Sequence, residues 1–277
     1  MKVGFLTAPF GREQLSDVLN FASHAGFDCV EIAARPGGGH IDLSKPTSEA
    51  KNVLRLVREH GVQISALAFY ANPIPPDKGE RAKMKEALKR AVDWCKALNV
   101  NCLCAMAGMP YEGKTKMECI EKDAAPLYRE ICKYAARKGV NIALENWYAT
   151  LIQHLDHWEK LFELCPADNF GLNFDPSHLV HQGIDYLAAV DEFKERVFHT
   201  HAKDTEIRED VVRRRGRIDS GWWRYVIPGY GVIDWGVYTA RLRRAGINSV
   251  MSIEHEDAAL GREEGFVKGL HYLRQFA

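Results

Sequence analysis

GVNIALEN, residues 139–146, sets a local pattern that the rest of the chain repeats. It contains a glycine, a short apolar run, and two polar residues, Glu145 and Asn146, where the run ends. Gly139 suits the left-handed conformation that ends a helix, and the apolar run has the length of a buried strand. The same helix-to-strand joint recurs along the chain, at Gly26, Gly61, Asn99 and Gly246. This repetition predicts parallel strands connected by helices.

Eight apolar runs predict the strands: Val3–Leu6, Cys29–Ile32, Gln63–Leu67, Cys102–Met106, Asn141–Leu144, Gly171–Phe174, Val197–His201 and Ser249–Ile253. Apolar residues at helical spacing predict helices between them, most clearly over Glu80–Leu98, Ala125–Arg137, His154–Leu164, Asp234–Arg244 and Glu263–Phe276. No linker rich in Pro, Gly or Ser divides the chain. We therefore expect one α/β domain over residues 1–277, a single (β/α)8 TIM barrel. A doubly wound sheet is the alternative, but the loop after the first strand lacks the G-x-G-x-x-G pattern.

The composition excludes several classes of protein. The 277 residues carry 37 Lys and Arg against 37 Asp and Glu, and 46% are hydrophobic, which excludes a disordered chain and argues against a nucleic-acid partner. No apolar run reaches the roughly 20 residues of a membrane helix, and the N-terminal residues do not resemble a signal peptide. We expect a cytoplasmic protein whose seven cysteines are buried free thiols. A metal pair at Cys102 and Cys104 is the less favoured alternative.

Four successive predicted strands finish in a carboxylate or an imidazole: Glu145, Asp175, His201 and Glu254. In a barrel, the carboxyl ends of the strands meet at one face, where active sites form. Three carboxylates and an imidazole gathered there require a neutralising cation. Oxygen-rich ligation with one imidazole favours Mn²⁺, with Mg²⁺ or Co²⁺ as alternatives, over structural zinc.

These motifs resemble those of the xylose-isomerase-like superfamily of sugar isomerases, epimerases and inosose dehydratases. The resemblance covers nearly the whole chain and is carried by Leu144–Asn146, Asp175–His178, His199–Asp204, Pro228–Trp235 and Ser252–Glu254. It implies that Glu145, Asp175, His201 and Glu254 bind one metal ion. It also implies that His178 contacts the substrate or supports the metal, and that the Pro228–Trp235 motif shapes the loop over the site.

The resemblance implies a small sugar or sugar-derived substrate and proton abstraction beside a carbonyl, through a metal-stabilised enediolate. Glu145 and Glu254 are then the acid–base pair of an isomerase or epimerase. A lyase or dehydratase that eliminates a β-leaving group from an inosose or a 3-oxo-glycoside is the main alternative. An endonuclease-IV-like enzyme is disfavoured, because the second to fourth strands end without histidine. A non-enzymatic sugar-binding barrel is disfavoured, because both glutamates are present.

Further residues are candidates for substrate binding. Lys203 and Asp204 follow the seventh strand, Trp147 follows Glu145, and Arg217 and Arg224 lie in a long segment, Lys203–Tyr230, that we expect to be irregular. Trp222 and Trp223 are candidates for a wall against the sugar. We expect His199 to point toward the helix layer, away from His201. Dimers or tetramers are common among proteins with these motifs, so a homo-oligomer is an open alternative.

Overall fold

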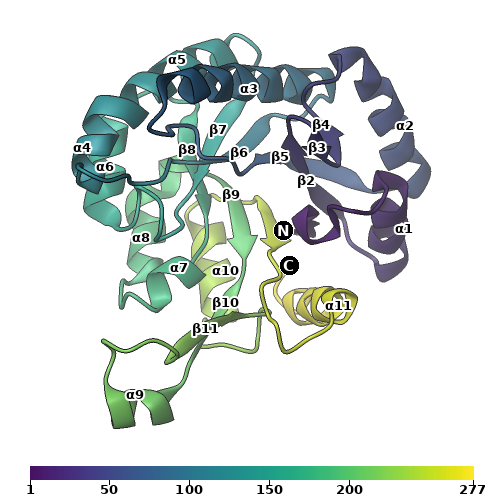
Figure 1. Ribbon diagram of the computed structural model, residues 1–277. Helices are drawn as coiled ribbons and strands as arrows, with labels where there is room; N and C mark the ends of the chain where they lie inside the picture. The colour runs from purple at the N-terminus through teal and green to yellow at the C-terminus, as the bar shows by residue number, and fades with distance from the viewer.

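The computed structural model describes all 277 residues and forms a closed barrel of parallel strands, with helices around its outside (Figure 1). The sheet closes because β1 (Lys2–Leu6) pairs with both β2 (Cys29–Arg35) and β12 (Val250–Ile253). Between β2 and β12 the sheet continues in chain order through β5 (Gln63–Phe69), β6 (Cys102–Met106), β7 (Asn141–Glu145), β8 (Phe170–Phe174) and β9 (Val197–Ala202). The predicted (β/α)8 barrel is therefore confirmed, with all eight strands at the predicted places.

The outer layer consists of α1 (Leu15–Ala25), α2 (Ala50–His60), α3 (Lys78–Ala97), α5 (Ala125–Ala136), α6 (Leu155–Leu164), α8 (Tyr186–Phe193), α10 (Trp235–Arg244) and α11 (Arg262–Leu273). In α2, Val53 and Val57 are buried one turn apart, while Arg55 and Glu59 form an exposed ion pair on the opposite side. The helix ends at Gly61, which has a φ of 68°. This pattern turns the apolar stripe of the helix toward the strands.

Shorter elements lie in the loops and at the ends of the longer helices. They are η1 (Ala8–Phe10), β3 (Gly38–Gly39), β4 (Ile41–Asp42), η2 (Thr47–Glu49), α4 (Lys116–Cys119), the π-helical turn η3 (Ile120–Ala124), α7 (Ser177–Val180) and η4 (Lys194–Arg196). No helix is both long and apolar enough to cross a membrane.

The segment that follows β9 forms an arm. β10 (Asp204–Ile207) pairs antiparallel with β11 (Trp223–Val226), and α9 (Glu209–Arg215) sits between them, at the end that projects from the barrel in Figure 1. The expectation of an irregular segment over Lys203–Tyr230 is therefore wrong. The two strands are only four residues each and lie far apart along the chain, so neither shows a pattern that reads as a strand by itself.

Candidate metal and substrate site

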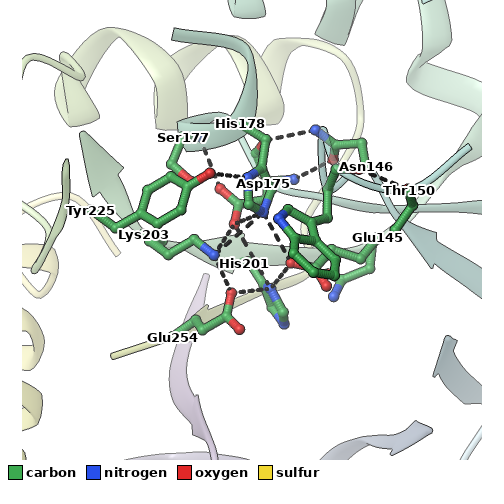
Figure 2. A network of polar contacts seen from close by, with 12 residues as sticks. Glu145, Asn146, Thr150, Asp175, Ser177, His178, His201, Lys203, Tyr225 and Glu254 are labelled. Atoms are coloured by element: carbon green, nitrogen blue, oxygen red, sulfur yellow. Dashed lines mark hydrogen bonds and ion pairs between the residues drawn. The ribbon is translucent and has the colours of Figure 1, made fainter. Parts of the chain in front are cut away.

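The carboxyl ends of β7, β8, β9 and β12 bring Glu145, Asp175, His201 and Glu254 to one point (Figure 2). From Nδ1 of His201, the nearest carboxylate oxygens lie at 3.4 Å on Glu145, 3.9 Å on Asp175 and 3.2 Å on Glu254. Asp175 and His201 are fully buried, and the other two side chains are nearly so. The structure thus brings the four predicted ligands together.

Two buried atoms at this point make no hydrogen bond of good geometry, although charged groups lie near both: Oδ2 of Asp175 is 3.3 Å from Nζ of Lys203, and Nδ1 of His201 is 3.2 Å from Oε2 of Glu254. An unpaired polar atom inside a protein costs free energy, and native structures rarely keep one without a reason. Three carboxylates with an imidazole suit a hard or borderline divalent cation. The donor set and the two unpaired atoms therefore fit a bound metal ion.

His178 offers a second imidazole to the same point. Its Nε2 lies 3.2 Å from Oε1 of Glu145 and 3.5 Å from Oδ2 of Asp175. One ligand atom each from Glu145, Asp175, His178 and Glu254 all lie within 4.8 Å of one another. The Nδ1 of His178 is 2.5 Å from the hydroxyl of Tyr225. His178 is thus placed both to support the cation site and to reach a molecule beside it.

Asn146 orients Asp175. Its amide donates to the backbone carbonyl of Asp175 at 2.8 Å, and its carbonyl oxygen accepts from the backbone N–H of Asp175 at 2.7 Å. The Oδ1 of Asp175 accepts from the backbone N–H of Ser177 at 2.8 Å. These contacts leave Oδ2 as the oxygen that faces the site. Asn146 follows Glu145 directly, but the sequence alone assigned it no role.

Glu31 on β2 contacts Nε2 of His201, the ring nitrogen that faces away from the carboxylate cluster. Its Oε2 lies 3.0 Å from Nε2 of His201 and accepts from the hydroxyl of Ser252 at 2.8 Å, while Oε1 accepts from Tyr70 at 2.9 Å. A carboxylate on one ring nitrogen fixes the tautomer and leaves the other nitrogen for a metal. Sequence reasoning missed Glu31. The available signal was one charged residue inside the apolar run Cys29–Ile32.

His199 also points into the barrel, so the expected orientation toward the helix layer is wrong. Residues two apart on a strand share a face, and His199 and His201 are two apart. The ring of His199 contacts Oδ1 of Asn173 at 2.9 Å and the hydroxyl of Ser65 at 3.2 Å. Burial lowers its pKa to about 4, so the ring is neutral near pH 7. It fills a layer beneath His201.

Lys203 reaches into the ligand cluster, and its side chain is 1% exposed. Its Nζ lies 2.6 Å from Oε2 of Glu254, 3.3 Å from Oδ2 of Asp175 and 3.3 Å from Nε2 of His178. Burial lowers the pKa of Lys203, but the carboxylates of Glu254, Asp175 and Glu145 outweigh burial and hold it well above its ordinary value. The ammonium group therefore stays charged beside the carboxylates.

Two carboxylates of the cluster, those of Glu145 and Glu254, are held in the charged form. Burial raises the pKa of Glu145, but the neighbouring imidazoles of His178 and His201 outweigh burial and hold the pKa well below its ordinary value. Burial also raises the pKa of Glu254, but the positive charge of Lys203 outweighs burial and lowers the pKa below its ordinary value. By contrast, burial raises the pKa of Glu256, whose Oε1 lies 3.4 Å from Nζ of Lys203. Glu256, which the sequence did not single out, is the carboxyl of this group best suited to carry a proton.

The base of the arm forms an aromatic wall next to His178. The ring of Trp223 stacks on His181 at 3.9 Å between centroids and meets Tyr148 edge-on at 5.8 Å. Tyr225 lies under the ammonium group of Lys203, 4.5 Å from ring centroid to Nζ. Trp147 is half-buried beside Tyr148, with the centroids 6.4 Å apart. The arm thus closes one side of the site.

The three remaining candidates have partners of their own. Asp204 accepts hydrogen bonds from the indole of Trp235 at 2.9 Å and from backbone N–H groups of residues 205, 229 and 233. Arg224 pairs with Asp257 at 2.6 Å and with Glu206. Arg217 lies 3.7 Å from Glu209 and over the ring of Trp222, with about half of its side chain exposed. These contacts hold the arm and its neighbouring loops, and the substrate roles of these three residues stay predictions.

Comparison with known proteins gives one family. Residues 19–276 match the family described as xylose isomerase-like TIM barrel. The protein named "Uncharacterized protein YfiH" of Bacillus subtilis is 26% identical over 316 residues, which cover 99% of each chain. An inosose isomerase of Bacillus velezensis is 26% identical over 250 residues, covering 88% of this chain and 84% of that protein. An inosose dehydratase of Geobacillus thermodenitrificans is 30% identical over 149 residues, covering 51% and 49%.

Solved structures share the fold. A D-tagatose 3-epimerase-like protein superposes with a TM-score of 0.78 and 20% identity, covering 100% of this chain and 97% of that one. The IOLI protein with a binding zinc atom superposes with a TM-score of 0.77 and 21% identity, covering 100% and 99%. Identities this low establish the common barrel and nothing finer.

Proposed function

Because the chain belongs to the xylose isomerase-like TIM barrel family, we propose that it is a divalent-metal-dependent sugar isomerase or epimerase that moves a proton on the carbon beside a carbonyl. The observation that carries this proposal is the convergence of carboxylates around two buried atoms that make no hydrogen bond, Oδ2 of Asp175 and Nδ1 of His201. A cation held there, next to a base, is the arrangement that enolisation of a hydroxy-ketone needs.

Glu145, Asp175, His201 and Glu254 would hold the metal ion, with His178 beside them. The oxygen-rich set supports Mn²⁺ first, then Mg²⁺ or Co²⁺. Zinc is a further alternative for the metal ion, because one solved structure with the same fold binds a zinc atom. When bound, the metal ion polarises the carbonyl and a neighbouring hydroxyl of the substrate.

Glu145 and Glu254 would act as the acid–base pair. They come from β7 and β12, and each places a carboxylate oxygen within 3.4 Å of Nδ1 of His201, so both face the same small volume. One carboxylate accepts the proton from carbon, and the other returns a proton to the product. The lowered pKa values of both groups keep a base available at neutral pH.

His178, Lys203 and Trp147 would bind the substrate. His178 and Lys203 offer donors at hydroxyl or carbonyl oxygens, and the ammonium group of Lys203 stabilises negative charge that develops there. The aromatic wall of Tyr148, Trp223 and Tyr225 would pack against the apolar C–H face of a sugar or cyclitol ring. The predicted contributions of Asp204, Arg217 and Arg224 are indirect in this proposal, through the arm that carries the wall.

A lyase or dehydratase is the second candidate, and Glu256 favours it. Its raised pKa would let it carry a proton that a departing hydroxyl or aglycone could take. Nζ of Lys203 contacts both Glu254 and Glu256, so the two carboxyl groups are close together. Glu254 as the base and Glu256 as the acid would then act on neighbouring carbons of the substrate. The inosose dehydratase among the relatives is consistent with this reaction type.

One experiment separates the candidates. The protein is loaded with Mn²⁺ and incubated in D2O with ketoses, inososes and 3-oxo-glycosides, and the products are followed by NMR and mass spectrometry. Deuterium at a carbon with the skeleton retained identifies an isomerase or epimerase. Loss of water or aglycone identifies a lyase. Binding of Mn²⁺ without exchange in any compound contradicts both proposals and supports a binding protein.

A further inference from the structure

The arm reaches back to the site through two aromatic side chains of β11. Trp223 and Tyr225 are two residues apart on this strand, so they share one face. His178 and His181 lie three residues apart, on α7 and directly after it, and Trp223 and Tyr225 contact them from the arm (Figure 2). We propose that Tyr225 is a positioning residue, whose hydroxyl orients the imidazole of His178 in the metal and substrate site.

The side chain of Tyr225 is itself held from several sides. The centroid of its ring lies 5.0 Å from that of Trp223 and 4.5 Å from Nζ of Lys203. Trp223 in turn stacks on His181, with the centroids 3.9 Å apart and the ring planes 5° apart. The hydroxyl of Tyr225 also lies 3.3 Å from Nε2 of His181. These contacts leave the ring little room to move, so its hydroxyl is a fixed point for His178 to bind.

The two ring nitrogens of His178 have different surroundings. Nδ1 lies 2.5 Å from the hydroxyl of Tyr225 and makes no other hydrogen bond. Nε2 lies among the charged groups of the site, 3.2 Å from Oε1 of Glu145 and 3.3 Å from Nζ of Lys203. A hydroxyl can donate or accept, so it suits Nδ1 in either tautomer. Without this hydroxyl, Nδ1 would be buried with no partner, and the direction of Nε2 would no longer be fixed.

The other imidazole of the site has a similar support. Glu31 lies 3.0 Å from Nε2 of His201 and leaves Nδ1 of that ring facing the carboxylates. Glu31 belongs to a barrel strand and brings a carboxylate, whereas Tyr225 belongs to the arm and brings a hydroxyl. Groups that bind the far side of an imidazole set its orientation. The arm therefore supplies part of the geometry of the site as well as one of its walls.

The kinetic consequence of this role rests on the proposed function, in which His178 offers a hydrogen bond to an oxygen of the substrate. Tyr225→Phe removes the hydroxyl and keeps the ring, with its packing on Trp223 and its contact with Lys203. We expect kcat to fall by about 10–100-fold, because the imidazole is no longer aimed, and KM to stay within about threefold of the parent value.

NMR of the protein labelled with 15N-histidine tests the contact without any turnover. The spectra are recorded with Mg²⁺, which is diamagnetic, and the ring signals of His178 are identified by their absence in His178→Gln. We expect the Nδ1 signal of His178 to shift in Tyr225→Phe. It should keep its position in Tyr148→Phe, because Tyr148 lies near both histidine rings without a hydrogen bond to either. An unchanged Nδ1 signal in folded Tyr225→Phe would overturn the proposal.

A double-mutant cycle tests whether Tyr225 acts through His178. With a substrate that shows exchange, Tyr225→Phe combined with His178→Gln should be no slower than His178→Gln alone. Tyr134→Phe is the matched control, since it removes a tyrosine hydroxyl that donates to Asp93 in the outer layer, and it should keep the parental kcat. Losses that multiply in the double variant would overturn the proposal. If the parent protein turns over none of the compounds, the proposed function fails, and the NMR comparison still decides whether Tyr225 orients His178.

Discussion

Two layers of polar side chains lie inside the barrel, and they differ in how completely their polar atoms are hydrogen-bonded. In the upper layer, Glu145, Asp175, His201 and Glu254 converge, and two of their atoms have no hydrogen-bond partner. In the lower layer, Glu31, Tyr70, Asn173, His199 and Ser252 bond to one another or to the ring of His201, and none has an unpaired side-chain atom. A satisfied layer is rigid, whereas an unsatisfied layer has capacity left for a ligand. The lower layer thus positions the side chains above it, and the upper layer is the one with room to bind a ligand.

The largest effect is expected from removing a charge in the upper layer while keeping its shape. Glu254→Gln should lower kcat by about 10²–10⁴-fold, because an amide cannot move the proton. The measurement is turnover of whichever substrate shows deuterium exchange with the parent protein. Glu159→Gln, an exposed glutamate on α6, is the control and should keep full activity. A Glu254→Gln protein with parental turnover would remove Glu254 from the acid–base pair.

The lower layer should control stability in acid. Burial lowers the pKa of His199 to about 4 from its ordinary 6.5, so the unfolded chain binds a proton that the folded protein refuses between those values. The free energy of unfolding should therefore fall as the pH drops from 6.5 to 4, by ~3 kcal/mol from this group, and level off below. Urea unfolding across this range measures it. His199→Gln should flatten the slope, and His24→Gln, on the surface of α1, should not.

Metal removal should affect the upper layer alone. A chelator should abolish proton exchange and lower the Tm, and Mn²⁺ at 100 times its Kd should restore ~2.7 kcal/mol of stability. Thermal unfolding with and without Mn²⁺ measures this gain. Asp175→Asn should lose most of the gain, because its Oδ2 faces the site. An equal metal-dependent rise in Tm for Asp175→Asn and the parent protein would move the cation site elsewhere.

Glu31→Gln connects the two layers and should have a smaller effect. The substitution keeps the contact with His201 but weakens its orientation, so metal affinity should fall by about 10–100-fold. Isothermal titration with Mn²⁺ measures the affinity, and Glu159→Gln again serves as control. At saturating metal, kcat should stay much closer to the parental value than for Glu254→Gln. If Glu31→Gln instead behaves like Glu254→Gln, the lower layer takes part in the reaction itself.

The smallest effect is expected from the tip of the arm. Arg217→Ala removes an exposed ion pair with Glu209 and the contact with Trp222, which should change stability by less than ~1 kcal/mol. KM and kcat should stay within about twofold of the parent. A large rise in KM would instead support the predicted substrate-binding role of Arg217, and would place the tip of the arm over the substrate.

Some parts of the structure can be predicted from the sequence, and others cannot. Gly139 and the run before Glu145 predict a joint and a strand because both depend on neighbouring residues. Glu31 was missed because its strand shows only one charge in an apolar run, and its partner is 170 positions away along the chain. The inward orientation of His199 does follow from the sequence, because His199 and His201 are two residues apart on one strand and therefore share a face.

What the sequence determined alone is the barrel and the four residues at its strand ends. Both follow from local periods and from chain order, since a closed parallel sheet turns every strand end to one face. Which groups meet across the barrel depends on the tertiary structure. It joined Glu31 to His201 and placed Lys203 among the carboxylates. Such contacts depend on side-chain packing between distant segments, and no local pattern in the chain encodes them.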